Sequence, residues 1–244
     1  SRKLLFVCVG ILRDNSPTVL DRFSLLGLSE NENIGSFTVV LDIEPNSDVF
    51  LNVASNDIGE IAVDSNSQQL HFTPLNWNTP QTVLIMGVDD TIIDGDQLTQ
   101  ITVSVDASSD PSFLMEPSQQ LDVINIDNDL AQIIIDPIDQ LSGEDGSLAS
   151  FSVRLSATPT APVQISWASS NINEGSLSSS TTIFSATNWD HPQIITVIGV
   201  DDLIPVNDGA INYSIFITAI SSTDPFFGNI IPASVDPVAM INQD

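Results

Sequence analysis

The residues of this sequence with the clearest chemical potential are its aspartates, and the chemistry that they indicate is the binding of hard cations. The chain of 244 residues holds 25 Asp but only seven Glu. Aspartate favours turns and short loops, and loop carboxylates are oxygen ligands of the kind that Ca²⁺ takes from proteins. A surface that merely solvates helices would also contain plentiful Glu and Lys. Adaptation to a salty habitat is the alternative explanation of this composition.

The charge of the chain restricts its partners. Five Lys and Arg stand against 32 acidic residues, and four of these five cations precede residue 23. Arg154 is therefore the only cation in the rest of the chain, which carries nearly all of the acids. Such a body repels phosphate backbones and anionic lipid surfaces. The sequence predicts no nucleic-acid partner, and it favours metal cations.

A long internal repeat organises the acidic residues. The phrase Gly-Val-Asp-Asp occurs at 87–90 and again at 199–202, and Asn-Trp-x-x-Pro-Gln occurs at 76–81 and again at 188–193. Both phrases recur after 112 residues, and three other landmarks recur after 114: Phe37 with Phe151, Pro45 with Pro159, and Asp110 with Asp224. A repeat of about 110 residues has the size of an independent domain. We therefore expect two domains, at 18–129 and 130–244.

The elements that must position these residues are β-strands. Apolar and polar residues alternate along 36–43 and 98–106 and again along 149–156 and 211–219, which is the period of a half-buried strand. No stretch of ten residues carries a helical stripe. Seven strands per copy are predicted near 19–27, 36–43, 48–54, 69–73, 81–88, 98–106 and 120–126, and near 131–136, 149–156, 163–168, 181–185, 193–200, 211–219 and 234–241. This spacing is typical of two Greek-key sandwiches of immunoglobulin type.

The segment 1–17 lies outside the repeat in this interpretation. Its apolar run from Leu4 to Leu12 is far shorter than the roughly 20 residues of a membrane-spanning helix, so no membrane span is expected. Because each copy has its seven strands already, one hypothesis is that this run adds as a strand to a neighbouring subunit and joins copies into a filament. The alternatives are an extra strand on its own first domain and an unprocessed leader.

Stabilisation of the two domains must come from something other than disulfides. Cys8 is the only cysteine, so no disulfide forms within the chain. Bound metal is then the remaining staple if the domains live outside the cell, and the Lys-poor, Asp- and Ser-rich body is typical of an exported protein. The joint 125–130 is short and acidic, and we expect metal to stiffen it by neutralising mutual repulsion.

Several of these phrases together resemble the Calx-beta repeats, which occur in sodium/calcium exchangers and in large bacterial surface adhesins. The resemblance covers about residues 19–244 and is strongest with the bacterial arrays. The residues that carry it are Leu28-Ser29-Glu30, Asn-Trp-x-x-Pro-Gln, Gly-Val-Asp-Asp with Asp94-Gly95-Asp96, Ser109-Asp110-Pro111, and Asn125-x-Asp127-x-Asp129.

The resemblance implies calcium at one end of each sandwich. The matching acids of the first copy are Glu30, Asp89, Asp90, Asp94, Asp96, Asp127 and Asp129. The second copy departs from the pattern, because its loop after Gly-Val-Asp-Asp is two residues longer and fewer acids remain: Glu144, Asp201, Asp202, Asp208 and Asp244. Fewer carboxylates predict weaker affinity for Ca²⁺. Ordinary solvated turn acids are the alternative interpretation of all these positions.

Other residues that could do chemistry favour structural roles. Trp77 and Trp189 suggest carbohydrate stacking, but their repeated setting before a strand favours packing. His71 and His191 do not recur in the other copy, and no activated Ser or Cys accompanies either one. The acids lie in shared turn motifs and not in a cleft-forming insertion of the kind that glycoside hydrolysis requires. The sequence therefore predicts no enzyme.

The function expected from the sequence is mechanical. We expect an exported or cell-surface protein, structural or adhesive, that calcium stabilises and that associates with further copies of itself or with other surface proteins. The alternative is a calcium-dependent module that binds a glycan or a receptor. A calcium sensor coupled to a membrane transporter is the least favoured class.

Overall fold

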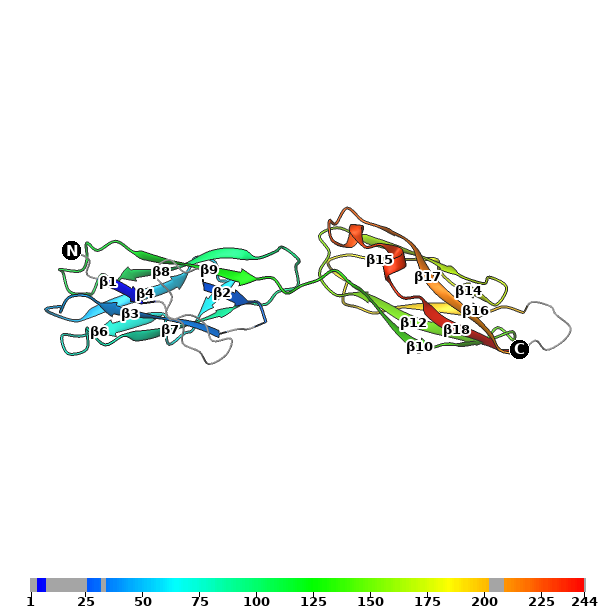
Figure 1. Cartoon of the computed structure of the whole chain (residues 1–244), viewed down its shortest axis with the longest axis horizontal. Coiled ribbons are helices and arrows are strands. Elements are labelled where there is room, and N and C mark those ends of the chain that lie inside the picture. Colours follow the sequence, from blue (N-terminus) through cyan, green and yellow to red (C-terminus); the bar gives the residue numbers. More distant parts are fainter. Residues whose placement is uncertain (1–3, 8–25, 32–33, 202–208, 244) are drawn as a thin grey trace. The chain divides into compact units, whose positions relative to one another are not determined.

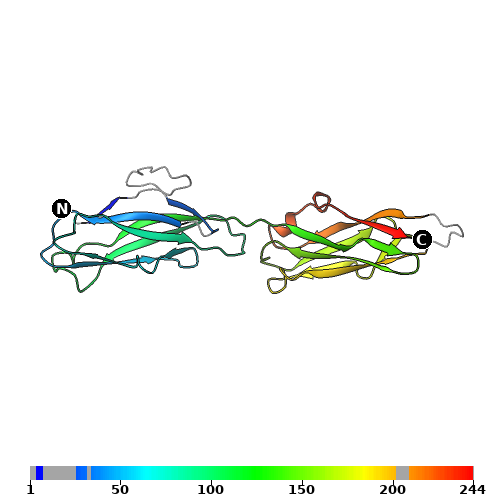
Figure 2. The ribbon, with the colours of Figure 1, turned by 90° about the horizontal axis from the view of Figure 1, so that it is seen from below.

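The computed structural model describes residues 4–7, 26–31, 34–201 and 209–243. The chain divides into two compact units (Figure 1). Unit 1 comprises Ser1–Asp90 and Asp94–Asn128, and unit 2 comprises Thr91–Ile93 and Asp129–Asp244. Each unit is a sandwich of two β-sheets, as the layered strands in Figure 2 show.

The strands of unit 1 form a four-stranded and a five-stranded sheet. Their bounds are β1 (Leu4–Val7), β2 (Leu26–Ser29), β3 (Ile34–Leu41), β4 (Val49–Ser55), β5 (Ile61–Val63), β6 (Gln69–Phe72), β7 (Gln81–Gly87), β8 (Gln97–Val105) and β9 (Gln119–Ile126). The sheet orders are β1-β3-β7-β5 and β2-β9-β8-β4-β6. Neighbouring strands are antiparallel except β2 and β9, which run parallel.

Unit 2 repeats this topology. Its strands are β10 (Ile133–Asp139), β11 (Leu141–Gly143), β12 (Leu148–Leu155), β13 (Val163–Ser169), β14 (Gly175–Leu177), β15 (Thr181–Phe184), β16 (Gln193–Gly199), β17 (Ile211–Ser221) and β18 (Val238–Gln243). The sheet orders are β10-β12-β16-β14 and β11-β18-β17-β13-β15. β11 and β18 form the parallel pair.

Each unit has its own apolar core between its two sheets. Alternate residues of the strands point inward, as the period of two predicted: Phe37, Val39 and Leu41 of β3 are at most 2 % exposed. Phe151, Val153 and Leu155 of β12 are their buried counterparts in unit 2. The prediction of an all-β sandwich fold is confirmed.

The structure divides the β residues more finely than the sequence suggested. The prediction omitted β5 and β14, which have three residues each. It also read 131–136 as one first strand of unit 2, whereas the structure has β10 in one sheet and β11 in the other, separated by Gln140 alone. Most of the strand predicted at 19–27 lies outside the described residues, and β2 is its described end.

The premise that residues 4–12 contain a spare strand is wrong for the part that the structure describes. β1 pairs with β3 of its own chain, with Leu4 opposite Leu41 and Val7 opposite Thr38. Figure 1 shows β1 alongside β3 at the edge of the sheet. The alternative of an extra strand on its own first domain describes this pairing, and the filament hypothesis loses the observation that motivated it.

Helical structure is slight in the described part of the chain. It consists of two 3₁₀ turns, η1 (Phe227–Asn229) and η2 (Pro232–Ser234), both before β18. Neither they nor any other helix among the described residues is long and apolar enough to cross a membrane.

Candidate metal centre

Three loops of unit 1 bring acidic residues to one end of its sandwich. Because β2 and β9 run parallel with Ser29 opposite Ile126, both strands end at the same edge of the sheet. Glu30 follows β2, and its backbone N–H donates to the Ile126 carbonyl oxygen at 3.2 Å. The loop from β7 to β8 returns to the same place, since Gln97 pairs with Asn125.

The centre of this arrangement is a cluster of three carboxylates. Glu30, Asp127 and Asp129 each offer one oxygen, and these oxygens all lie within 4.8 Å of one another. Carboxylates held this close repel one another unless a cation neutralises them. The cluster therefore has the ligand type and the spacing of a site for a hard cation.

Glu30 is the most unusual member of the cluster. Its side chain is only 1 % exposed, and among the described residues its Oε2 has no hydrogen-bond partner. Burial raises the pKa of Glu30 from its ordinary 4.5 to about 7, and the negative charges of Asp127, Asp90 and Glu60 add to that rise. A buried carboxylate without a donor is costly, so this oxygen lacks a ligand that the isolated protein does not supply.

Two residues of the site were missed by sequence reasoning as members of the ligand set. The Asn125 amide nitrogen donates to Glu30 Oε1 at 3.3 Å, to Glu60 Oε2 at 3.0 Å and to the Val88 carbonyl oxygen at 3.0 Å. Asn125 is fully buried. Glu60 could have been found from the repeat, since Glu174 lies 114 residues later, the same separation that relates Phe37 to Phe151.

The other predicted ligands of the first copy lie in the surrounding loops. Asp96 Oδ1 accepts the Asp127 backbone N–H at 3.3 Å, and Asp127 Oδ2 accepts the Gly95 backbone N–H at 2.7 Å. Asp89 Oδ1 accepts an amide hydrogen of Asn128 at 3.1 Å. Asp94 is exposed. These contacts tie the β7–β8 loop to the end of β9, while Glu30, Asp127 and Asp129 form the cluster itself.

The glycine of the Gly-Val-Asp-Asp phrase is required by close packing beside this site. A Cβ atom on Gly87 would collide with the Ser29 carbonyl oxygen and would lie 2.7 Å from Asn125 Oδ1. A Cβ on Gly199 would collide with the backbone of Gly143 in the same way. Both copies therefore keep glycine where the end of β7 or β16 passes the end of β2 or β11.

Unit 2 satisfies the corresponding buried groups internally. Asn242, the counterpart of Asn125, donates to Glu174 Oε2 at 3.2 Å and to the Val200 carbonyl oxygen at 3.0 Å. Its Oδ1 accepts the Ser142 hydroxyl at 3.1 Å, and Ser142 also lies 2.9 Å from the Tyr213 hydroxyl. In unit 1 the Asn125 Oδ1 has no such donor among the described residues.

The predicted ligands of the second copy form no metal-type cluster among the described residues. Glu144 is half-buried and Asp201 is exposed. Asp202, Asp208 and Asp244 lie outside the described residues.

The repeated Ser-Asp-Pro turn has a structural role at the opposite end of each unit. Asp110 Oδ2 accepts the backbone N–H groups of Asn46 and Ser47 at 2.6 and 2.9 Å. Asp224 accepts four hydrogen bonds of 2.8 Å, from the N–H and hydroxyl of Thr160 and from the N–H groups of Phe226 and Phe227. Each aspartate therefore fastens a distant loop to its own turn.

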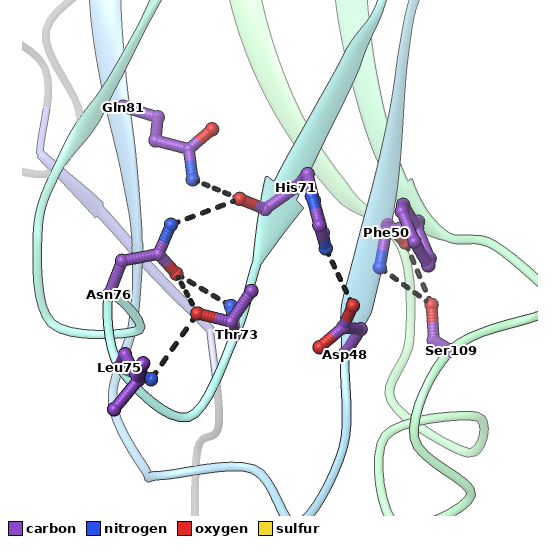
Figure 3. Close-up of polar contacts among 8 residues, drawn as sticks. All are labelled: Asp48, Phe50, His71, Thr73, Leu75, Asn76, Gln81 and Ser109. Atoms are coloured by element: carbon purple, nitrogen blue, oxygen red, sulfur yellow. Dashed lines mark hydrogen bonds and ion pairs between the residues drawn. The ribbon is translucent and has the colours of Figure 1, made fainter.

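The Asn-Trp-x-x-Pro-Gln phrase is also structural. Asn76 Oδ1 accepts the Thr73 backbone N–H at 2.5 Å, and the Gln81 side chain donates to the His71 carbonyl oxygen at 2.6 Å (Figure 3). Asn188 and Gln193 make the same two contacts, with Ser185 and Ile183. The phrase closes the turn between β6 and β7, or between β15 and β16.

The tryptophans and histidines of the phrase or its surroundings carry no arrangement for ligand chemistry. Trp77 and Trp189 are half-buried and pack on their respective cores, as the packing interpretation predicted. His71 lies 2.9 Å from Asp48 and stacks on Phe50 with ring centroids 4.5 Å apart, and Figure 3 shows the Asp48 contact.

Comparisons with known proteins support the fold alone. No family model matches the chain, and no curated protein matches it. Among solved structures, the calcium binding domain CBD12 of CALX1.1 is 14 % identical, with 89 % of this chain and 95 % of that chain covered and a TM-score of 0.38. CBD12 from CALX1.2 is 13 % identical, with coverages of 82 % and 79 % and a TM-score of 0.35.

A bacterial-type surface protein is also among the similar structures. Domains 4 and 5 of the S-layer protein SbsC are 12 % identical, with 99 % of this chain and 96 % of that chain covered and a TM-score of 0.33. Identities and scores this low leave the metal site to be argued from the residues of this chain.

Proposed function

We propose that unit 1 binds Ca²⁺ at the cluster of Glu30, Asp127 and Asp129, and that the ion stabilises its sandwich. The observation that carries this proposal is Glu30 Oε2, a buried carboxylate oxygen without a hydrogen-bond donor among the described residues, facing two further carboxylates. A cation supplies what this oxygen lacks. Asp90 and Glu60 raise the pKa of Glu30 through their charges, so the ion would also reduce repulsion from these two residues.

The chemistry of the donor set selects Ca²⁺ over other metals. Every candidate ligand is an oxygen, and the described cluster includes no His or Cys, which zinc and copper prefer. Ca²⁺ takes about six to eight oxygens in variable geometry, whereas Mg²⁺ requires near-ideal octahedral geometry. Carboxylates from three separate loops supply many oxygens without a fixed geometry, and this suits the larger ion.

The role that follows is structural and not catalytic. The repeated motifs of the described chain close turns and fasten loops, and the acids outside the cluster serve these turns. We propose an exported structural or adhesive protein of two sandwich domains, in which calcium makes unit 1 resistant to unfolding. The calcium binding named for CBD12 of CALX1.1 and the surface layer named for SbsC belong to those proteins, and both agree with the proposed class.

Calcium titration of the chelated protein tests the proposal. We expect thermal unfolding to shift upward with Ca²⁺, since an ion at a hundredfold excess over its Kd adds about 2.7 kcal/mol to the free energy of unfolding. Hydrogen-exchange mass spectrometry should show protection in peptides that contain Glu30 and the segments 88–96 and 125–129. An unchanged melting temperature together with unchanged exchange in these peptides would contradict the proposal.

A further inference from the structure

The outer edge of β3 is covered less completely than the matching edge in unit 2. β1 has four residues and pairs with positions 38–41 of β3. β10 has seven residues and pairs with β12 from Leu155 to Ser150. Among the described residues, positions 34–37 of β3 have backbone partners only on the β7 side.

The repeat assigns this edge to a segment other than β1. Leu4 lies opposite Leu41, and Ile133 lies opposite Leu155, the counterpart of Leu41 after 114 residues. The same separation relates Glu30 to Glu144 and places 19–25 as the sequence equivalent of β10. Two segments of the sequence, 4–7 and 19–25, therefore match one strand position, and one of them is in excess.

The connection after β1 is long enough to serve a second molecule. β10 and β11 are separated by one residue, whereas β1 and β2 are separated by residues 8–25. Eighteen residues can span up to about 60 Å when extended. The same pairing can then form within one copy or between two, which is the usual requirement for exchange of a strand.

Charge favours a second copy as the source of the strand. Residues 1–22 carry four of the five cations, and the rest of the chain is strongly acidic. The N-terminal strand of any copy is therefore attracted to the body of any other copy. We propose that the β3 edge of unit 1 is a docking site for Leu4–Val7 of a second copy, and that the protein self-associates by exchanging this strand.

Disulfide trapping in a Cys8→Ser background tests the proposal. Leu5 lies opposite Val40 in the register, so one preparation carries Leu5→Cys and a second, with a different mass tag, carries Val40→Cys. When the two are mixed, concentrated and oxidised, we expect a covalent heterodimer. Val7→Cys with Thr38→Cys, the other outward pair of this register, repeats the test if the first pair impairs folding.

Unit 2 offers the matched control. Ile134 lies opposite Arg154 at the corresponding place, and its short connection forbids exchange. Ile134→Cys and Arg154→Cys should give a disulfide within the double variant and no heterodimer from the mixed single variants. If mixed Leu5→Cys and Val40→Cys chains behave like this control, the proposal is overturned. The trapping is run with and without Ca²⁺, so its result does not depend on the metal proposal.

Discussion

At the scale of single residues, the two units differ in how they treat a buried polar pair. In unit 2 the Asn242 oxygen accepts the Ser142 hydroxyl, so that side chain is satisfied by its own protein. In unit 1 the position of Ser142 is taken by Leu28, which is buried and has no side-chain donor. The buried polar atoms of unit 1 are therefore left for a ligand, and this contrast locates the metal proposal in unit 1.

Glu30→Gln should separate stability from calcium binding. Without calcium, the variant loses a buried negative charge that faces Asp127, Asp90 and Glu60, so we expect the free energy of unfolding at pH 8 to rise by about 1 kcal/mol. The stabilisation by Ca²⁺ should disappear. Urea unfolding with and without the ion measures both quantities.

Glu144→Gln is the matched control for that variant. Glu144 is the counterpart of Glu30 but is half-buried, and no acidic cluster forms around it in the described chain. We expect the calcium response of this variant to equal that of the unchanged protein. A Glu30→Gln protein that still responds fully to Ca²⁺ would place the ion elsewhere.

The residues of the site could be predicted from the sequence only in part. Glu30, Asp127 and Asp129 were expected, because carboxylates at strand ends are visible as motifs. The roles of Asn125 and Glu60 depend on which side chains the sheet register brings together, and no local pattern contains that information. Glu60 left a signal in the repeat, since acids at 60 and 174 keep the separation of the core phenylalanines.

At the scale of elements, the repeated phrases act as fasteners of loops and turns. We expect Asn76→Ala to lower the free energy of unfolding of unit 1 by about 1 kcal/mol, because Thr73 loses the acceptor of its backbone N–H. Asn188→Ala should cost about the same in unit 2, where Ser185 loses the same acceptor. Chemical unfolding followed by hydrogen exchange assigns each loss to its unit, and a loss in the opposite unit would contradict this role.

The Ser-Asp-Pro turns predict a loss of stability in acid. Burial opposes the ionisation of Asp224, but hydrogen bonds from Phe227, Thr160 and Phe226 prevail and hold its pKa below the usual 3.8. Hydrogen bonds that begin with those of Ser112 lower the pKa of Asp110 to about 2. Because both folded values are depressed, their contribution is present above pH 3.8 and is lost as the pH falls toward 2.

Asp224→Asn tests that acid dependence. An amide cannot accept at both of its ends, so the variant should lose about 1–3 kcal/mol at pH 7. It should also lose less stability than the unchanged protein between pH 4 and pH 2, because one of the titrating groups is gone. Thermal unfolding across this range measures the difference, and parallel acid profiles for the two proteins would refute the assignment.

Strand prediction succeeded where the pattern was long and failed where an element was short. β3, β8, β12 and β17 alternate over eight or more residues, and the sequence placed all four. β5 and β14 have three residues, too few for a period to be seen, and they exist because β7 and β16 offer them an edge. The pairing of β1 was hidden because two segments suit the same edge.

At the scale of the whole molecule, a net charge of −27 opposes the compact state. We expect NaCl to stabilise the chelated protein gradually, since the screening length falls to about 10 Å at 0.1 M salt. This response belongs to the charge as a whole and involves no particular residue. It is also what the alternative of adaptation to a salty habitat predicts.

Ca²⁺ and Na⁺ at matched ionic strength distinguish these two origins of stability. A bound ion acts through its Kd and saturates, whereas screening depends on ionic strength alone. We expect calcium to raise the melting temperature and then reach a plateau, and NaCl of the same ionic strength to leave it nearly unchanged at that point. Equal curves for the two salts would mean that the acidic loops are only a screened surface, and the cluster around Glu30 would then have no metal to hold.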